Sequence, residues 1–177
     1  MKKSILFFLL LAPLFAFQNK PVRTIFMIGD STMANKDLNG GNPERGWGHI
    51  LPGFFSEEIQ VDNHAVNGRS TKSFIDEGRW ETVINQVKPG DYVFIQFGHN
   101  DQKEDEARHT DPGSTFDANL EKFITETISK GGKPVLFTSI ARRHFDEKGK
   151  LIDSHGQYIT ATRNVAAKLN IPLIDLN

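Results

Sequence analysis

The sequence predicts an α/β domain with a mostly parallel sheet, and three observations carry this prediction. Short apolar runs recur along the chain of 177 residues. Amphipathic stretches with helical periodicity separate these runs, and polar turns that contain glycine follow the first three of them. Strands that alternate with helices connect by right-handed crossovers. We therefore expect a three-layer α/β/α sandwich around a five-stranded parallel sheet.

The chain begins with a segment that is typical of a leader. Residues 1–3 include two lysines, and residues 4–17 form an apolar block with small and turn-forming residues near its end. This block is too short to cross a bilayer comfortably, and its pattern is that of a secretory signal peptide. We expect a signal peptide over 1–17, a secreted or periplasmic protein, and one domain over 22–177. The alternative is a buried or membrane-anchored N-terminal helix.

The expected strands are five short apolar runs that are bounded by turn-forming residues. They cover 24–28, 60–66, 91–97, 134–139 and 172–175. In the flavodoxin-like strand order 2-1-3-4-5, the first strand lies between the second and the third. The turns that follow these three strands would then meet at one edge of the sheet.

Helices are expected between the strands, where apolar side chains recur at helical spacing. The stretch 47–55 has this pattern, although Pro52 within it must mark a start or a kink. A second stripe covers 80–87 and ends at 89–90, where proline and glycine stop a helix. Both segments are expected to pack on the sheet through their apolar side chains.

The second half of the chain contains two longer helical stripes. The first covers 116–128 and ends at the glycine pair 131–132. Ser114 precedes this stripe and is expected to cap its N-terminus. The other stripe covers 158–169. These two helices complete the alternation with the last two strands.

Composition and charge exclude several classes of function. The formal net charge is −1, so there is no electrostatic case for a nucleic-acid partner or an anionic membrane. The chain has no cysteine, which excludes disulfides and a lipid-modified cysteine. We also expect no cofactor and no metal: histidines do not cluster at metal-ligand spacing, and the glycines lack the spacing of dinucleotide or phosphate loops.

The three polar turns hold the candidate catalytic residues, which are Ser31, Gly68 and Asn100. A serine hydroxyl attacks an acyl carbon only where a base accepts its proton and fixed donors hold the oxyanion. Ser31 offers the hydroxyl and its own N–H, Gly68 offers an N–H on a backbone that can approach closely, and the Asn100 amide is a third donor. Each turn by itself has an ordinary alternative as a capping turn or a turn glycine. Their shared position after consecutive strands favours ester hydrolysis.

These motifs resemble blocks I, II and III of the SGNH or GDSL hydrolase superfamily. Longer strings resemble the rhamnogalacturonan acetylesterases of that superfamily; they cover 29–34, 46–48, 68–74, 78–80 and 97–102. The resemblance extends from about Thr24 to the last residue. It implies that Ser31 is the nucleophile and that Gly68 and Asn100 complete the oxyanion hole. It also implies that the partner is an acetylated plant cell-wall polysaccharide, a pectic chain such as rhamnogalacturonan.

One part of the family pattern is not found. The superfamily carries its catalytic Asp and His in an Asp-x-x-His block after the last strand, and this sequence contains no such block. We therefore expect a C-terminally truncated domain whose last helix is missing. The triplet 153–155 is one residue short of the motif, and we interpret it as the start of a helix. For His99 the resemblance implies a structural or substrate-side role, while His49 and His64 are interpreted as packing residues.

Alternatives for function and substrate contact stay open. The expected function is that of a serine esterase that removes acetyl groups from pectic polysaccharide through an acyl-enzyme on Ser31. The alternatives are an esterase of this superfamily that acts on acetylated xylan or short lipid esters, and a non-catalytic fragment that lacks its histidine base and binds glycan. Arg69, Arg79 and Trp80 are candidate contacts for a uronic acid polymer, which needs cationic donors and flat surfaces. The periodicity of its helix favours a core position for Trp80.

Overall fold

The computed structural model describes residues 22–177, and the expected signal peptide over 1–17 lies outside them. Five strands form one parallel sheet in the order β2-β1-β3-β4-β5. The strands are β1 (Arg23–Gly29), β2 (Ile59–Asn63), β3 (Tyr92–Gln96), β4 (Lys133–Phe137) and β5 (Leu173–Ile174). The predicted α/β class and strand order are confirmed.

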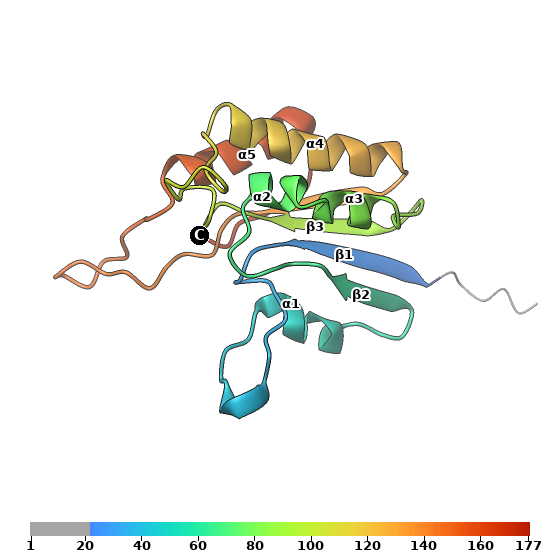
Figure 1. Ribbon diagram of the computed structural model, residues 1–177, viewed down its shortest axis with the longest axis horizontal. Coiled ribbons are helices and arrows are strands. Elements are labelled where there is room, and N and C mark those ends of the chain that lie inside the picture. The colour runs from blue at the N-terminus through green and yellow to red at the C-terminus, as the bar shows by residue number, and fades with distance from the viewer. Residues whose placement is uncertain (1–21) are drawn as a thin grey trace, which may run out of the picture.

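Helices cover both faces of the sheet, which gives the predicted three layers (Figure 1). One face carries α2 (Thr71–Asp76), α3 (Arg79–Ile84), α4 (Thr115–Ser129) and α5 (Gln157–Leu169). The opposite face carries α1 (Trp47–Ile50) and the 3₁₀ turn η2 (Leu51–Phe54), and a further 3₁₀ turn, η1 (Asn39–Gly41), lies in the loop before α1. Among residues 22–177, no helix combines the length and the apolar character needed to cross a membrane.

The larger core lies under α2 to α5 and is dominated by aromatic rings. The Trp80 and Phe123 ring centroids are 4.8 Å apart, and those of Phe74 and Phe97 are 5.5 Å apart. Trp80 is 3% exposed, and its indole N–H donates to the Glu126 carboxylate over 2.6 Å. The structure therefore confirms the core position of Trp80 and leaves its ring unable to stack on a sugar.

The opposite face is joined to α1 by a second aromatic group. The Trp47 ring lies 5.1 Å from Phe137, which lies 5.1 Å from Phe94. The indole N–H of Trp47 donates to the Gln96 side chain over 2.8 Å, at the end of β3. After α1 the helix changes to 3₁₀ geometry with Pro52 in its first turn, which is the predicted kink.

Three local features differ from the sequence predictions. Strand β2 ends at Asn63, three residues earlier than predicted, and the Asn63 side chain there donates to Met33 O and accepts from Ala65 N. Helix α3 ends at Ile84, three residues before Val87. Helix α2 was not predicted, since six residues are too few for an apolar stripe.

The capping prediction for Ser114 is correct in position and wrong in mechanism. Ser114 is the N-cap residue of α4, but its hydroxyl donates to Asp111 O and makes no cap hydrogen bond. Asp117 in the first turn accepts instead from Gly113 N over 2.8 Å. The capping box of this protein is at α2, where the Ser70 and Ser73 side chains each accept from the other residue's N–H.

Candidate functional site

The three polar turns follow β1, β2 and β3 and are bonded to one another at the carboxyl edge of the sheet. Val66 N donates to Gly29 O over 3.0 Å, which connects the end of β1 with the approach to the second turn. The Thr32 hydroxyl lies 3.1 Å from the Gln96 side-chain oxygen, which places the first turn against the end of β3. The strand order therefore brings together the segments that hold Ser31, Gly68 and Asn100, as predicted.

The turn that holds Ser31 is fixed by its buried neighbour Asp30. The Asp30 carboxylate accepts from Thr32 N over 2.9 Å and from the Thr32 hydroxyl over 2.8 Å, and the Asp30 carbonyl accepts from Met33 and Ala34. Ser31 is half-buried, and its hydroxyl has no hydrogen-bond partner within residues 22–177. The turn therefore holds a hydroxyl on a rigid backbone and leaves that hydroxyl free for a reaction partner.

The second turn places Gly68 in a backbone conformation that requires glycine. Its φ is 77°, in the left-handed region that side chains disfavour. A Cβ built at Gly68 would meet no protein atom within 4 Å, so the protein leaves open the space beside this residue. A ligand oxygen can therefore approach the Gly68 N–H through this open space.

The third turn orients the Asn100 side chain against the second turn. Asn100 is 8% exposed, and its Nδ2 donates to Arg69 O over 3.0 Å. An amide nitrogen carries two hydrogens, so this bond uses one and leaves the other for a ligand. The bond also fixes the side chain beside the residue that follows Gly68.

Asp101 fastens the second and third turns together, a role that the sequence did not reveal. Its Oδ1 accepts from Thr71 N and from the Thr110 hydroxyl, each over 2.9 Å, and from the Thr71 hydroxyl. Its Oδ2 accepts from Gly98 N over 3.0 Å. Burial raises the pKa of Asp101 to about 6, against the opposing effect of these hydrogen bonds. Because the Asp101 side chain is fully buried, water cannot replace its carboxylate as the acceptor for these donors.

The triplet 153–155 starts a helix, as interpreted from the sequence. The Asp153 carboxylate accepts from His155 N over 2.9 Å and from Gly156 N over 3.2 Å, just before α5. His155 is 3% exposed, and its ring nitrogen Nε2 lies 2.5 Å from Nδ1 of His99. Sequence reasoning missed this pair, because 56 residues separate its members.

Both histidines of this pair are held neutral. Burial, and then the positive charge of Arg142, lowers the pKa of His99 to about 4. Burial also lowers the pKa of His155 to about 4, with further contributions from His99 and Arg142. Neither ring is therefore a cation at neutral pH.

The neutral state of His155 predicts a pH dependence of stability. Its folded pKa of about 4 lies below the ordinary value of 6.5, so between these pH values the unfolded chain binds a proton that the folded protein does not. The wild-type protein should therefore lose stability relative to His155→Phe as the pH falls from 6.5 to 4, by up to about 1.4 kcal/mol per pH unit. Urea unfolding of both full-length proteins at pH 5 and pH 7 measures this difference. The assignment of a neutral His155 would be contradicted if the stability difference between the two proteins were the same at pH 5 and pH 7. It would also be contradicted if the wild-type protein gained stability relative to His155→Phe at pH 5.

The remaining residues proposed from the sequence have other partners. Arg79 and Arg69 both place Nε on the Glu77 carboxylate, at 2.5 and 3.1 Å, so neither guanidinium is free of a counter-ion. His49 accepts from Lys36 N through Nδ1, and His64 lies 3.0 Å from the Asp62 carboxylate. No group of three metal-ligating side chains is found within 22–177.

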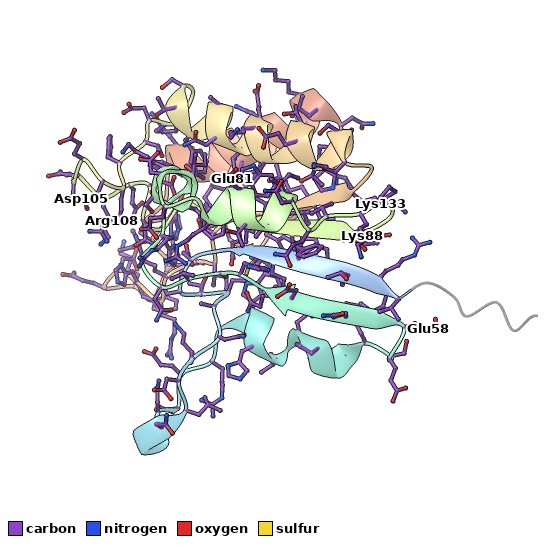
Figure 2. The ribbon with its side chains drawn as sticks, turned by 45° about the vertical axis from the view of Figure 1, so that its right-hand side comes forward. Glu58, Glu81, Lys88, Asp105, Arg108 and Lys133 are labelled. Atoms are coloured by element: carbon purple, nitrogen blue, oxygen red, sulfur yellow. The ribbon has the colours of Figure 1, made fainter. Side chains whose placement is uncertain are left out.

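A charged loop borders the third turn. It runs from Asp101 to Gly113 and leaves the body of the domain at the carboxyl end of the sheet. Figure 2 shows Asp105 and Arg108 on this loop, whereas Glu58 lies at the opposite end of the strands. Arg108 donates to Asp105 through Nε over 2.9 Å, and both side chains are partly exposed.

The chain is similar to known proteins in both sequence and structure. Residues 27–177 match the model of the GDSL-like lipase/acylhydrolase family. The chain is 43% identical over 157 residues to rhamnogalacturonan acetylesterase RhgT of Bacillus subtilis, over 89% of this chain and 66% of the relative. It is 28% identical over 173 residues to the rhamnogalacturonan acetylesterase of Emericella nidulans, over 86% of this chain and 66% of the relative. The chain thus spans about two thirds of the length of these curated relatives.

The solved structures agree with the sequence comparison. The structure of YxiM from Bacillus subtilis matches with a TM-score of 0.74 and 31% identity, over 88% of this chain and 44% of that chain. The lipase/acylhydrolase from Enterococcus faecalis matches with a TM-score of 0.60 and 25% identity, over 87% of this chain and 76% of that chain. The same fold is therefore found in a protein that is described as a lipase/acylhydrolase.

Proposed function

The chain belongs to the GDSL-like lipase/acylhydrolase family, and on this premise we propose that it is a serine esterase that removes acetyl groups from pectic polysaccharide such as rhamnogalacturonan. The family membership confirms the resemblance seen in the three motifs. The observation that carries the proposal is the joining of the turns of Ser31, Gly68 and Asn100 at one edge of the sheet. The substrate is proposed from two relatives, RhgT of Bacillus subtilis and the enzyme of Emericella nidulans, both of which are named rhamnogalacturonan acetylesterases.

The proposed reaction proceeds through an acyl-enzyme. The Ser31 hydroxyl attacks the acetyl carbonyl carbon, a base accepts its proton, and the carbonyl oxygen becomes an oxyanion. The N–H groups of Ser31 and Gly68 and the second amide hydrogen of Asn100 hold this oxyanion. Collapse of the intermediate breaks the bond to the sugar oxygen, which leaves with a proton. Water then attacks the acetyl-serine ester, and acetate is released.

The base in this proposal is the histidine that the family resemblance implies. That residue belongs to an Asp-x-x-His block, which the present sequence does not contain. Within 22–177, His99 and His155 face each other, and His49 accepts from Lys36. Activity is therefore to be measured on the full-length protein.

Loss of the Asn100 amide should slow catalysis without removing it. Replacing Asn100 with alanine removes one of three proposed oxyanion donors, and the loss of one such donor costs roughly 10²- to 10³-fold in kcat. Acetate release from acetylated rhamnogalacturonan measures the effect. Asn164→Ala is the matched control, because Asn164 is an exposed residue of α5, away from the three turns. An Asn100→Ala protein with the kcat of this control would contradict the proposed role.

The substrate is tested with a panel of esters. We expect the full-length protein to prefer acetylated rhamnogalacturonan over acetylated xylan and short lipid esters. A preference for the lipid ester or for xylan would contradict the pectic assignment and leave the esterase mechanism standing. Glycan binding without acetate release would instead support the non-catalytic alternative.

The cellular location is also a proposal. The composition of residues 1–17 favours export to the periplasm or the medium, where a polymer too large to cross the inner membrane is accessible. Fractionation of expressing cells measures the location, and retention of the uncleaved protein in the cytoplasm would contradict it.

A further inference from the structure

We propose that His155 acts as a positioning residue for His99, so that His99 presents an Nε2–H donor to an oxygen of the sugar that carries the ester. The assignment of the ring hydrogens rests on the structure of the pair. The contact with the sugar rests, in addition, on the proposed function. His99 directly precedes the proposed oxyanion residue Asn100.

The two imidazoles meet through one nitrogen from each ring. Nε2 of His155 lies 2.5 Å from Nδ1 of His99, the ring centroids are 4.4 Å apart, and the ring planes are within 8° of parallel. This contact uses Nδ1 of His99 and leaves its Nε2, which makes no hydrogen bond within the described part of the chain. His99 is half-buried and His155 is buried, so the inner ring supports an outer ring that reaches the surface.

The position of the hydrogens follows from an unpartnered atom. Each neutral imidazole carries one N–H, and the contact needs one donor and one acceptor. Nδ1 of His155 is enclosed and has no hydrogen-bond partner in the described part of the chain. A hydrogen there would be a buried N–H without an acceptor, which folded proteins avoid most strongly. The hydrogen of His155 is therefore on Nε2, it is donated to Nδ1 of His99, and the hydrogen of His99 is on Nε2.

Neighbouring groups keep this arrangement in place. Arg142 donates to the carbonyl and hydroxyl oxygens of Ser154 over 3.4 and 3.3 Å, and to His99 O over 3.4 Å. Arg142 therefore holds together the two chain segments that contain His99 and His155. With its amide oxygen turned toward the guanidinium, Gln102 accepts from both terminal nitrogens over 2.5 and 2.7 Å. All these acceptors are neutral, so the positive charge of Arg142 opposes protonation of the rings.

The charged groups around the pair act in both directions. Arg142 and Lys103 disfavour a proton on His99. Asp153 and Asp30 favour a proton on His155, but burial, His99 and Arg142 together outweigh them. A neutral pair with a fixed hydrogen pattern results. His99 then offers a donor of fixed direction, which suits a hydroxyl or carboxylate oxygen of a sugar and not another donor.

Nitrogen NMR of the full-length protein tests the hydrogen positions directly. Long-range ¹H–¹⁵N spectra of the imidazoles distinguish the two tautomers, and His99→Gln and His155→Gln proteins assign the signals. At pH 7 we expect both histidines as neutral Nε2–H tautomers. An Nδ1–H tautomer, a mixture of tautomers or a charged ring at His99 would overturn the assignment. This measurement does not depend on catalytic activity, so it can fail or succeed independently of the proposed function.

Kinetics test the contact with the sugar. His155→Phe keeps an aromatic ring and removes the donor, whereas His155→Gln retains a side-chain N–H. We expect His155→Phe to raise KM for the acetylated polysaccharide about tenfold with kcat changed less than about threefold, and His155→Gln to restore KM in part. His144→Phe is the matched control, since His144 is exposed and directly precedes the antiparallel bridge between Phe145 and Leu151.

The results separate the two parts of the proposal. An unchanged KM in His155→Phe and in His99→Phe would overturn the sugar contact, even where acetate release itself is normal. An equal fall of kcat in His155→Phe and His155→Gln, with KM unchanged, would indicate a structural role and would also overturn it. Where His155→Phe does not fold, the spectrum of the wild-type protein and the His99→Phe kinetics decide.

Discussion

Replacement of Ser31 with alanine is expected to lower kcat for acetate release from acetylated rhamnogalacturonan by roughly 10⁴- to 10⁶-fold. The reason is that the proposed reaction has no acyl acceptor without the Ser31 hydroxyl. The oxyanion donors remain in the variant, so a small rate above that of water should persist. Acetate release by the full-length protein under saturating substrate measures the effect.

The control for this variant is another serine that has no part in the site. Ser129 is the last residue of α4, and its exposed hydroxyl donates to Glu126 O. Ser129→Ala should retain the wild-type rate. Equal rates in Ser31→Ala and the wild-type protein would exclude Ser31 as the nucleophile, whatever the geometry around it.

Replacement of Asp101 with alanine is expected to lower the free energy of unfolding by about 3 to 5 kcal/mol. The buried carboxylate accepts from Thr71, Thr110 and Gly98, which lie on three separate segments. Its removal leaves these buried donors without an acceptor. It also releases the second turn from the third, so activity should fall together with stability. Urea unfolding of the full-length protein measures the change.

Asp105 provides the matched control in the same loop. Its carboxylate is exposed and pairs with Arg108, and exposed ion pairs contribute little to stability. Figure 2 shows both residues on this loop. Asp105→Ala should unfold at the same urea concentration as the wild-type protein. An Asp101→Ala protein that is as stable as Asp105→Ala would contradict the role given to the buried carboxylate.

The architecture was predictable because it follows from local patterns. Five apolar runs and the helical stripes between them indicate a parallel sheet, and the flavodoxin-like strand order chosen for it is the observed one. The same reasoning placed Ser31, Gly68 and Asn100 on neighbouring turns, since the carboxyl ends of parallel strands share one edge. Trp80 was assigned to the core from its helical spacing, and it is buried.

The contacts that complete the site were not predictable, because they join residues that are far apart in sequence. From the sequence alone, Asp101 is interpreted as an ordinary turn residue. Only the structure shows that Thr71, 30 residues away, donates to its carboxylate. His155 lies in a helix-start motif that explains its backbone and gives no sign of its ring partner. Local competition explains the smaller errors: Asp117 binds Gly113 N at the start of α4, where Ser114 was expected to cap.

The central claim is that the acyl group is carried by Ser31, and covalent labelling tests it most directly. The full-length protein is treated with a phosphonate ester that phosphonylates reactive serines, digested, and analysed by mass spectrometry. We expect one phosphonate on the peptide that contains Ser31, with loss of activity in proportion to labelling and slower labelling of Asn100→Ala. Complete inactivation with an unmodified Ser31 peptide, or with the phosphonate on another residue, would contradict the account.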